Sequence, residues 1–204
     1  MLKQAFFGKR HSKFKPNFLI KTFITSETIY WSAQQLIAPI LAIFIADELQ
    51  GGSVEIAGML VSVYWISRIF AELFSTRFLN KSTSKSKVIV VITGFILVGI
   101  ATLLYSFATT LLPFVILYAI TGLGLGIAGP QRTSLFATHL DKGYETTEAG
   151  IYDAIQFSGI ALASALGGFI ASRLGFNHLF IIAGTLSILS TVPYFLILGS
   201  KDLK

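Results

Sequence analysis

Several ionisable and amide side chains lie inside stretches of the chain that are otherwise apolar. Residues 22–46 contain Glu27 and Gln34, and a carboxylate inside a membrane helix costs roughly 2.5–3.5 kcal/mol on insertion scales. Such a group normally faces protein or water instead of lipid. Tyr30 or Trp31 lies between Glu27 and Gln34 at helical spacing. This spacing predicts one polar stripe that lines a cavity inside a helix bundle.

Three further charged residues lie within apolar stretches. Arg68 and Glu72 are four residues apart, so on a helix they share a face and can pair. The pair is either structural or a gate that breaks and reforms, and Arg68 could also attract an anionic substrate. Glu27 and Asp153 are candidate proton carriers, because burial favours the protonated form of a carboxylate. The alternative is that both carboxylates are solvated or capped near helix ends.

Amide and aromatic side chains extend this set of candidates. Gln34, Gln35 and Gln156 could bind a substrate or form hydrogen bonds between helices. Tyr30, Trp31, Tyr64 and Trp65 could line the cavity, and the alternative is packing or anchoring at the membrane interface. The three His residues have no metal-ligand spacing, so no metal site and no cofactor are predicted.

Composition places the chain among membrane proteins. Its 204 residues are 53% hydrophobic and 13% charged, with a mean hydropathy of +0.73, whereas soluble domains have about 25% charged residues. This excludes an ordinary soluble domain and, despite the net charge of +6, a basic nucleic-acid binder. The absence of Cys excludes disulfides and thiolate chemistry. No nucleotide-binding loop, nucleophile elbow, zinc-protease motif or Asn-Pro-Ala pair occurs, so neither an enzyme nor an aquaporin-like pore is expected.

The apolar pattern predicts an all-α protein that crosses the membrane six times. A basic tail, 1–17, and a short tail, 201–204, flank a transmembrane domain, 18–200. The expected helices cover residues 18–46, 56–76, 88–107, 111–129, 147–172 and 178–198, with a kink at Pro39. The fourth helix is expected to stop at Pro130, which places Arg132 in a polar loop, 131–146.

Lys and Arg residues predict the orientation in the membrane. With these boundaries, fourteen of the sixteen lie in the tails and loops of one side, and Arg173 alone lies on the other. The positive-inside rule therefore predicts that both termini are cytoplasmic. We expect an integral protein of the plasma (inner) membrane, in contact with its lipids.

The local sequence resembles one half of a major facilitator superfamily transporter. The run 148–180 resembles the fifth helix of that family and its exit turn, and the glycines before Pro130 resemble its fourth helix. The resemblance implies two inverted repeats of three helices, in which Ala57-Gly58 echoes Ala149-Gly150. It also implies close helix packing at the glycines, which are Gly122, Gly124, Gly126, Gly159, Gly167 and Gly168.

One family motif is altered here. The signature between the second and third helices, Gly-x-x-x-Asp-Arg-x-Gly-Arg-Arg/Lys, places its acid on Asn80 and its first Arg on Lys81. The resemblance implies a gating role for these two positions, although the glycines and the acid of the motif are absent. The antiporter pattern of the fifth helix retains only Gly167-Gly168, so the drug/proton antiporter branch is not assigned.

The leading hypothesis is therefore a secondary-transporter half. It would move a small solute by alternating access, with a proton as the candidate coupling ion, after pairing as a homodimer or heterodimer with a second six-helix half. One alternative is a non-transporting membrane scaffold or partner protein, and another is a fragment of a twelve-helix transporter.

Overall fold

The computed structural model describes residues 16–200, so residues 1–15 of the predicted basic tail (1–17) and the whole predicted tail at 201–204 lie outside the described residues. Within this range the chain is helical and forms no strand beyond an isolated bridge between Gln50 and Thr110. Its elements are α2 (Phe18–Ile37), α3 (Leu41–Asp47), α4 (Val54–Leu79), α5 (Ser84–Leu104), a 3-10 turn (Tyr105–Phe107), α6 (Leu111–His139), α7 (Glu145–Leu174), α8 (Phe176–Leu189) and α9 (Val192–Leu198). The described part contains six spans long and apolar enough to cross a membrane, which confirms the predicted all-α, six-span class.

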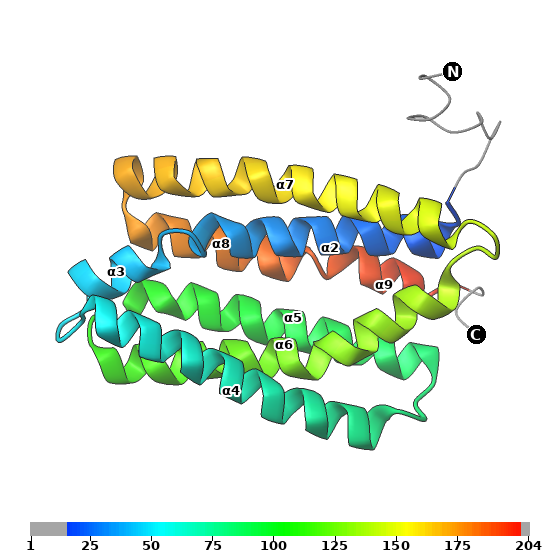
Figure 1. Cartoon of the computed structure of the whole chain (residues 1–204), viewed down its shortest axis with the longest axis horizontal. Coiled ribbons are helices and arrows are strands. Elements are labelled where there is room, and N and C mark those ends of the chain that lie inside the picture. The colour runs from blue at the N-terminus through cyan, green and yellow to red at the C-terminus, as the bar shows by residue number, and fades with distance from the viewer. Residues whose placement is uncertain (1–15, 201–204) are drawn as a thin grey trace.

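The helices run roughly side by side, with α4 along one flank and α7 along the other (Figure 1). The start of α2 and the end of α9 lie at one end of the bundle, here called the terminal end, and α3 lies at the opposite end. Side chains of the preceding residues cap three helix starts. Asn17 accepts from the Ile20 amide, Ser53 from Ile56 and Thr83 from Ser86. These caps satisfy backbone donors that have no partner within the helix.

The packing follows the symmetry expected for two repeats of three helices. The spans pack as α4 on α6 and α7 on α2, as α5 on α6 and α8 with α9 on α2, and α5 packs on α8. Exchanging the first three spans with the last three maps these main contacts onto one another. Gly126 and Gly167 permit close approaches between helices, because an added Cβ would lie 2.5 Å from the Arg68 carbonyl oxygen and 1.9 Å from that of Leu36. Small residues at such positions let two backbones pack in van der Waals contact.

Two spans are interrupted. The first breaks between α2 and α3 at Pro39, as predicted, because proline cannot donate a backbone hydrogen bond. The last breaks between α8 and α9 at Ser190 and Thr191, where the Ser26 hydroxyl donates to the Ser190 carbonyl oxygen. The second break places the start of α9 beside the middle of α2.

The predicted end of the fourth span is wrong. Helix α6 continues through Pro130 to His139, and the loop that follows is short. Neighbouring polar groups support the helix here: Ser75 of α4 donates to the Ile127 carbonyl oxygen at 2.8 Å and accepts from the Gln131 amide at 3.1 Å. Adjacent helices and Ser side chains commonly stabilise proline-containing spans in this way. As a result, Arg132 lies on helix α6 and not in the predicted loop.

Candidate functional site

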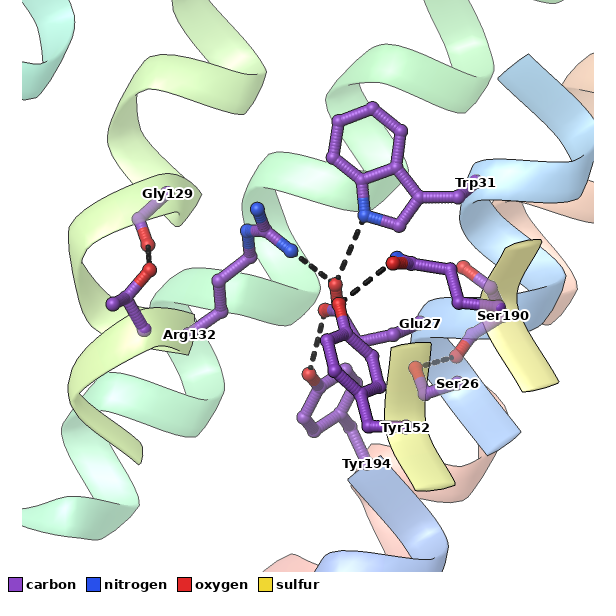
Figure 2. Close-up of polar contacts among 10 residues, drawn as sticks. Ser26, Glu27, Trp31, Gly129, Arg132, Tyr152, Ser190 and Tyr194 are labelled. Atoms are coloured by element: carbon purple, nitrogen blue, oxygen red, sulfur yellow. Dashed lines mark hydrogen bonds and ion pairs between the residues drawn. The ribbon is translucent and has the colours of Figure 1, made fainter. Parts of the chain in front are cut away.

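The centre of the site is the carboxylate of Glu27, which is completely buried on α2. Arg132 of α6 forms an ion pair with Oε2, and the Trp31 indole donates to the same oxygen at 3.2 Å. The Tyr194 hydroxyl, from α9, donates to Oε1 at 3.0 Å. Figure 2 shows these three side chains converging on Glu27. A buried carboxylate with an opposite charge and several donors is compensated for its loss of water.

Tertiary structure brings these groups together in a way that the predicted boundaries missed. Arg132 is 105 residues from Glu27 and was expected in a loop. Tyr194, within the sixth span, was not a predicted site residue. Apolar Leu135 and Phe136 follow Arg132, and this continued pattern is the signal that could have extended the helix.

Arg132 has an unsatisfied donor. Its Nε is buried and has no hydrogen-bond partner within the described residues. The guanidinium lies 5.2 Å from the centre of the Trp31 ring, a cation–π distance. Tyr152 of α7 lies on another side of the cluster (Figure 2) and accepts a 2.9 Å bond from Gln156. The Nε–H of Arg132 is therefore available to a further acceptor.

A cavity of about 370 Å³ adjoins this cluster. Its walls come from α2, α3, α4, α6 and the 3-10 turn, and they include Trp31, Gln34, Gln35, Tyr64, Trp65, Arg68, Tyr105, Tyr118 and Thr121. Its volume is within the usual range for pockets that bind small molecules. Trp31 belongs to both sites, because its ring lines the cavity while its N–H binds Glu27.

Arg68 and Glu72 form the predicted pair on α4, with Nε donating to Oε1 at 2.9 Å. The Arg68 guanidinium also lies 4.9 Å from the centre of the Trp65 ring. Arg68 lines the cavity, whereas Glu72 is not among the lining residues and its carboxylate is close to Gly129. The structure thus holds the cationic group at the cavity wall and its partner outside that wall.

The other predicted residues take different positions. Gln34 lines the cavity and donates to the Ser187 hydroxyl at 2.9 Å. Tyr30 was expected at the cavity, but it is fully buried and stacks on Phe95 with ring centres 3.8 Å apart. Tight packing against α5 therefore makes Tyr30 part of the core. Asp153 is exposed on α7 and is not among the groups that contact Glu27.

The predicted gating and packing residues also separate into groups. Asn80 and Lys81 are exposed in the loop between α4 and α5, at the terminal end, outside the site. Gly168 was predicted to pack against another helix, but an added Cβ there would meet no atom of the described residues within 4 Å, so it makes no close helix contact within this chain. The remaining predicted glycines do lie at close helix contacts: Gly122, Gly124, Gly126, Gly159 and Gly167.

Comparison with known proteins gives a consistent family. A sequence model of the Major Facilitator Superfamily matches residues 23–203. An uncharacterized MFS-type transporter of Methanocaldococcus jannaschii is 30% identical over 76% of this chain and 39% of its own length. The D-galactonate transporter of Escherichia coli is 24% identical over 87% of the chain and 40% of its length. The gallate transporter of Pseudomonas putida is 28% identical over 66% of the chain and 29% of its own length. The chain thus spans less than half the length of these relatives.

Proposed function

Because the chain belongs to the Major Facilitator Superfamily, we propose that it is a six-helix half of a secondary transporter. It carries a small solute across a membrane by alternating access after it pairs with a second half. The relatives named for D-galactonate and gallate support a small organic solute. The observation that carries the proposal is the shared Trp31, which joins a cavity of suitable size to a buried ion pair.

The geometry supports a coupling role for Glu27. When Glu27 takes up a proton, its carboxyl group loses the charge that attracts Arg132 but can still accept the hydrogen bond from Tyr194. The Arg132 guanidinium then turns towards another acceptor, and the ring of Trp31 beneath it moves with it. Because this ring is also part of the cavity wall, solute binding and proton binding influence each other.

Two features support pairing, either with a second copy or with a different half. The flanking helices α4 and α7 expose large apolar side chains, including Phe70 and Phe74 on α4 and Phe157 and Phe169 on α7. Asp153 also lies on the exposed part of α7, and a carboxylate inside a span is costly against lipid. A second half that covers these two helices would enclose the cavity and shield this charge.

The distribution of charge supports an orientation. At the terminal end of the bundle, the described residues include Lys21, Arg77, Lys85, Lys87 and Lys142, whereas Arg173 lies at the opposite end. The positive-inside rule assigns the terminal end to the cytoplasm. We propose that the protein resides in the plasma (inner) membrane with both termini cytoplasmic.

The coupling role is tested in liposomes that contain the full chain and a pH-sensitive dye, with D-galactonate and gallate as the first solutes. Glu27→Gln should abolish proton movement linked to solute entry, because glutamine retains hydrogen bonding but cannot change charge. Glu55→Gln, exposed in the first turn of α4, is the matched control. Proton-linked uptake by Glu27→Gln at the wild-type rate would refute the coupling role. A folded, paired protein that moves no solute from a wider panel would favour the scaffold hypothesis.

A further inference from the structure

The cavity carries charge of one sign. Among the described residues that line it, Arg68 alone carries a full charge at neutral pH. The remaining polar groups are amides, hydroxyls and the indole N–H groups. The acid that pairs with Arg68 is not part of the lining. A solute in this cavity therefore meets the Arg68 guanidinium, whereas the Glu72 carboxylate lies outside the lining, and this arrangement favours an anion.

The guanidinium of Arg68 is held in place and retains donors. Its contact with Glu72 uses Nε, and its plane is held near Trp65. A guanidinium has five N–H donors, so one ion pair leaves several for a second acceptor. Its planar fork matches a carboxylate, which can accept two parallel hydrogen bonds.

The walls beside Arg68 are aromatic. Trp31, Tyr64, Trp65 and Tyr118 all line the cavity, and the rings of Tyr64 and Tyr118 stack with centres 5.3 Å apart. Flat rings stack well on other flat groups. Building on the proposed function, we infer that the cavity binds a small organic carboxylate with a flat, apolar body, whose carboxylate is bound by Arg68.

The neighbouring acid then acts as a competitor. Glu72 already accepts a hydrogen bond from Arg68 Nε, so its negative charge weakens the attraction between Arg68 and an anionic solute. Removing the charge of Glu72 should strengthen binding of a carboxylate, whereas removing the charge of Arg68 should weaken it. A purely structural ion pair predicts that both changes are harmful or that neither matters.

The chain offers a direct optical probe, because it has two tryptophans and both, Trp31 and Trp65, line the cavity. Quenching of their fluorescence in the purified, detergent-solubilised protein would report a bound solute. The probes are benzoate, its neutral isostere benzamide and the cation benzylamine. We expect benzoate to bind most tightly, with benzamide and benzylamine weaker by about tenfold or more, as expected for loss of a charged hydrogen bond.

The variants test the role of each charge. Arg68→Gln should weaken benzoate binding by about tenfold or more, Arg68→Lys should lose less, and Glu72→Gln should tighten it. Arg77→Gln removes an exposed charge from the same helix and should leave binding unchanged. Binding of benzamide or benzylamine as tight as that of benzoate would overturn the inference. So would absence of quenching by all three probes, or equal losses in Arg68→Gln and Glu72→Gln.

Transport is measured separately in liposomes, so failure of the inference and failure of the proposed function can be told apart. Arg68-dependent benzoate binding without movement of any solute would uphold the carboxylate site and defeat the transporter proposal. Movement of solutes without Arg68-dependent carboxylate binding would uphold the transporter and defeat this inference.

Discussion

The described residues include two arginine–glutamate pairs, which differ in the helices they join and in the burial of the glutamate. Arg132 and Glu27 join α6 to α2 across the bundle, with side chains that are 16% and 0% exposed. Arg68 and Glu72 lie one turn apart on α4, with side chains that are 17% and 36% exposed. Trp31 stands between the two regions, since it touches the first pair and lines the cavity that Arg68 borders.

This difference predicts that the two pairs contribute unequally to stability and to solute binding. In the first pair the Glu27 carboxylate is fully buried, so it depends on Arg132 and on the other donors around it. In the pair on α4, Arg68 faces a cavity and Glu72 is partly exposed, so either can lose its partner and still be solvated. We therefore expect stability to depend mainly on the first pair and solute selectivity mainly on the second.

The largest effect on stability should come from breaking the buried pair. Arg132→Met leaves the Glu27 carboxylate without its counter-charge, which typically costs about 3–5 kcal/mol of the free energy of unfolding. Unfolding in mixed micelles of SDS and a mild detergent measures this loss. Combining it with Glu27→Gln should restore most of the stability, because no buried charge then remains. A double variant as unstable as Arg132→Met alone would contradict the comparison.

A smaller effect should follow from forcing α4 away from α6. In Gly126→Ala the new Cβ would lie 2.5 Å from the Arg68 carbonyl oxygen and 2.6 Å from the Ala71 Cβ. Such overpacking typically lowers the free energy of unfolding by about 1–3 kcal/mol. The helix shift that accommodates the new methyl group would also move Arg68 relative to the cavity. Gly168→Ala is the control, since open space surrounds that position. Equal losses in the two variants, measured by the same unfolding assay, would show that overpacking between α4 and α6 does not cause the loss of stability.

The smallest effect should come from the pair on α4. Arg68→Gln and Glu72→Gln should each change the free energy of unfolding by less than about 1 kcal/mol, as is usual for partly exposed pairs. The same micelle assay checks this, with Arg77→Gln as a reference for loss of one charge from α4. A loss of several kcal/mol in either variant would mean that this pair also stabilises the fold, and the contrast with Arg132 and Glu27 would disappear.

Some parts of the site could be predicted from the sequence and others could not. The membership of Gln34 and Arg68 in a cavity wall was predictable, because polar groups inside an apolar span need a polar environment. The position of Tyr30 was not, because Tyr30 and Trp31 are adjacent and helical spacing alone does not decide which one faces the cavity. Packing of Tyr30 on Phe95 made that choice.

The sequence by itself determined the six apolar spans, the break at Pro39 and the pair four residues apart on α4, because each depends on composition or on the repeat of a single helix. Tertiary structure alone decided the pairing of Glu27 with Arg132 and Tyr194. That pairing requires α6 to continue past Pro130, which contacts from Ser75 on a neighbouring helix support. It also requires α9 to restart beside α2. Such contacts join residues distant in the chain, so no local pattern could specify them.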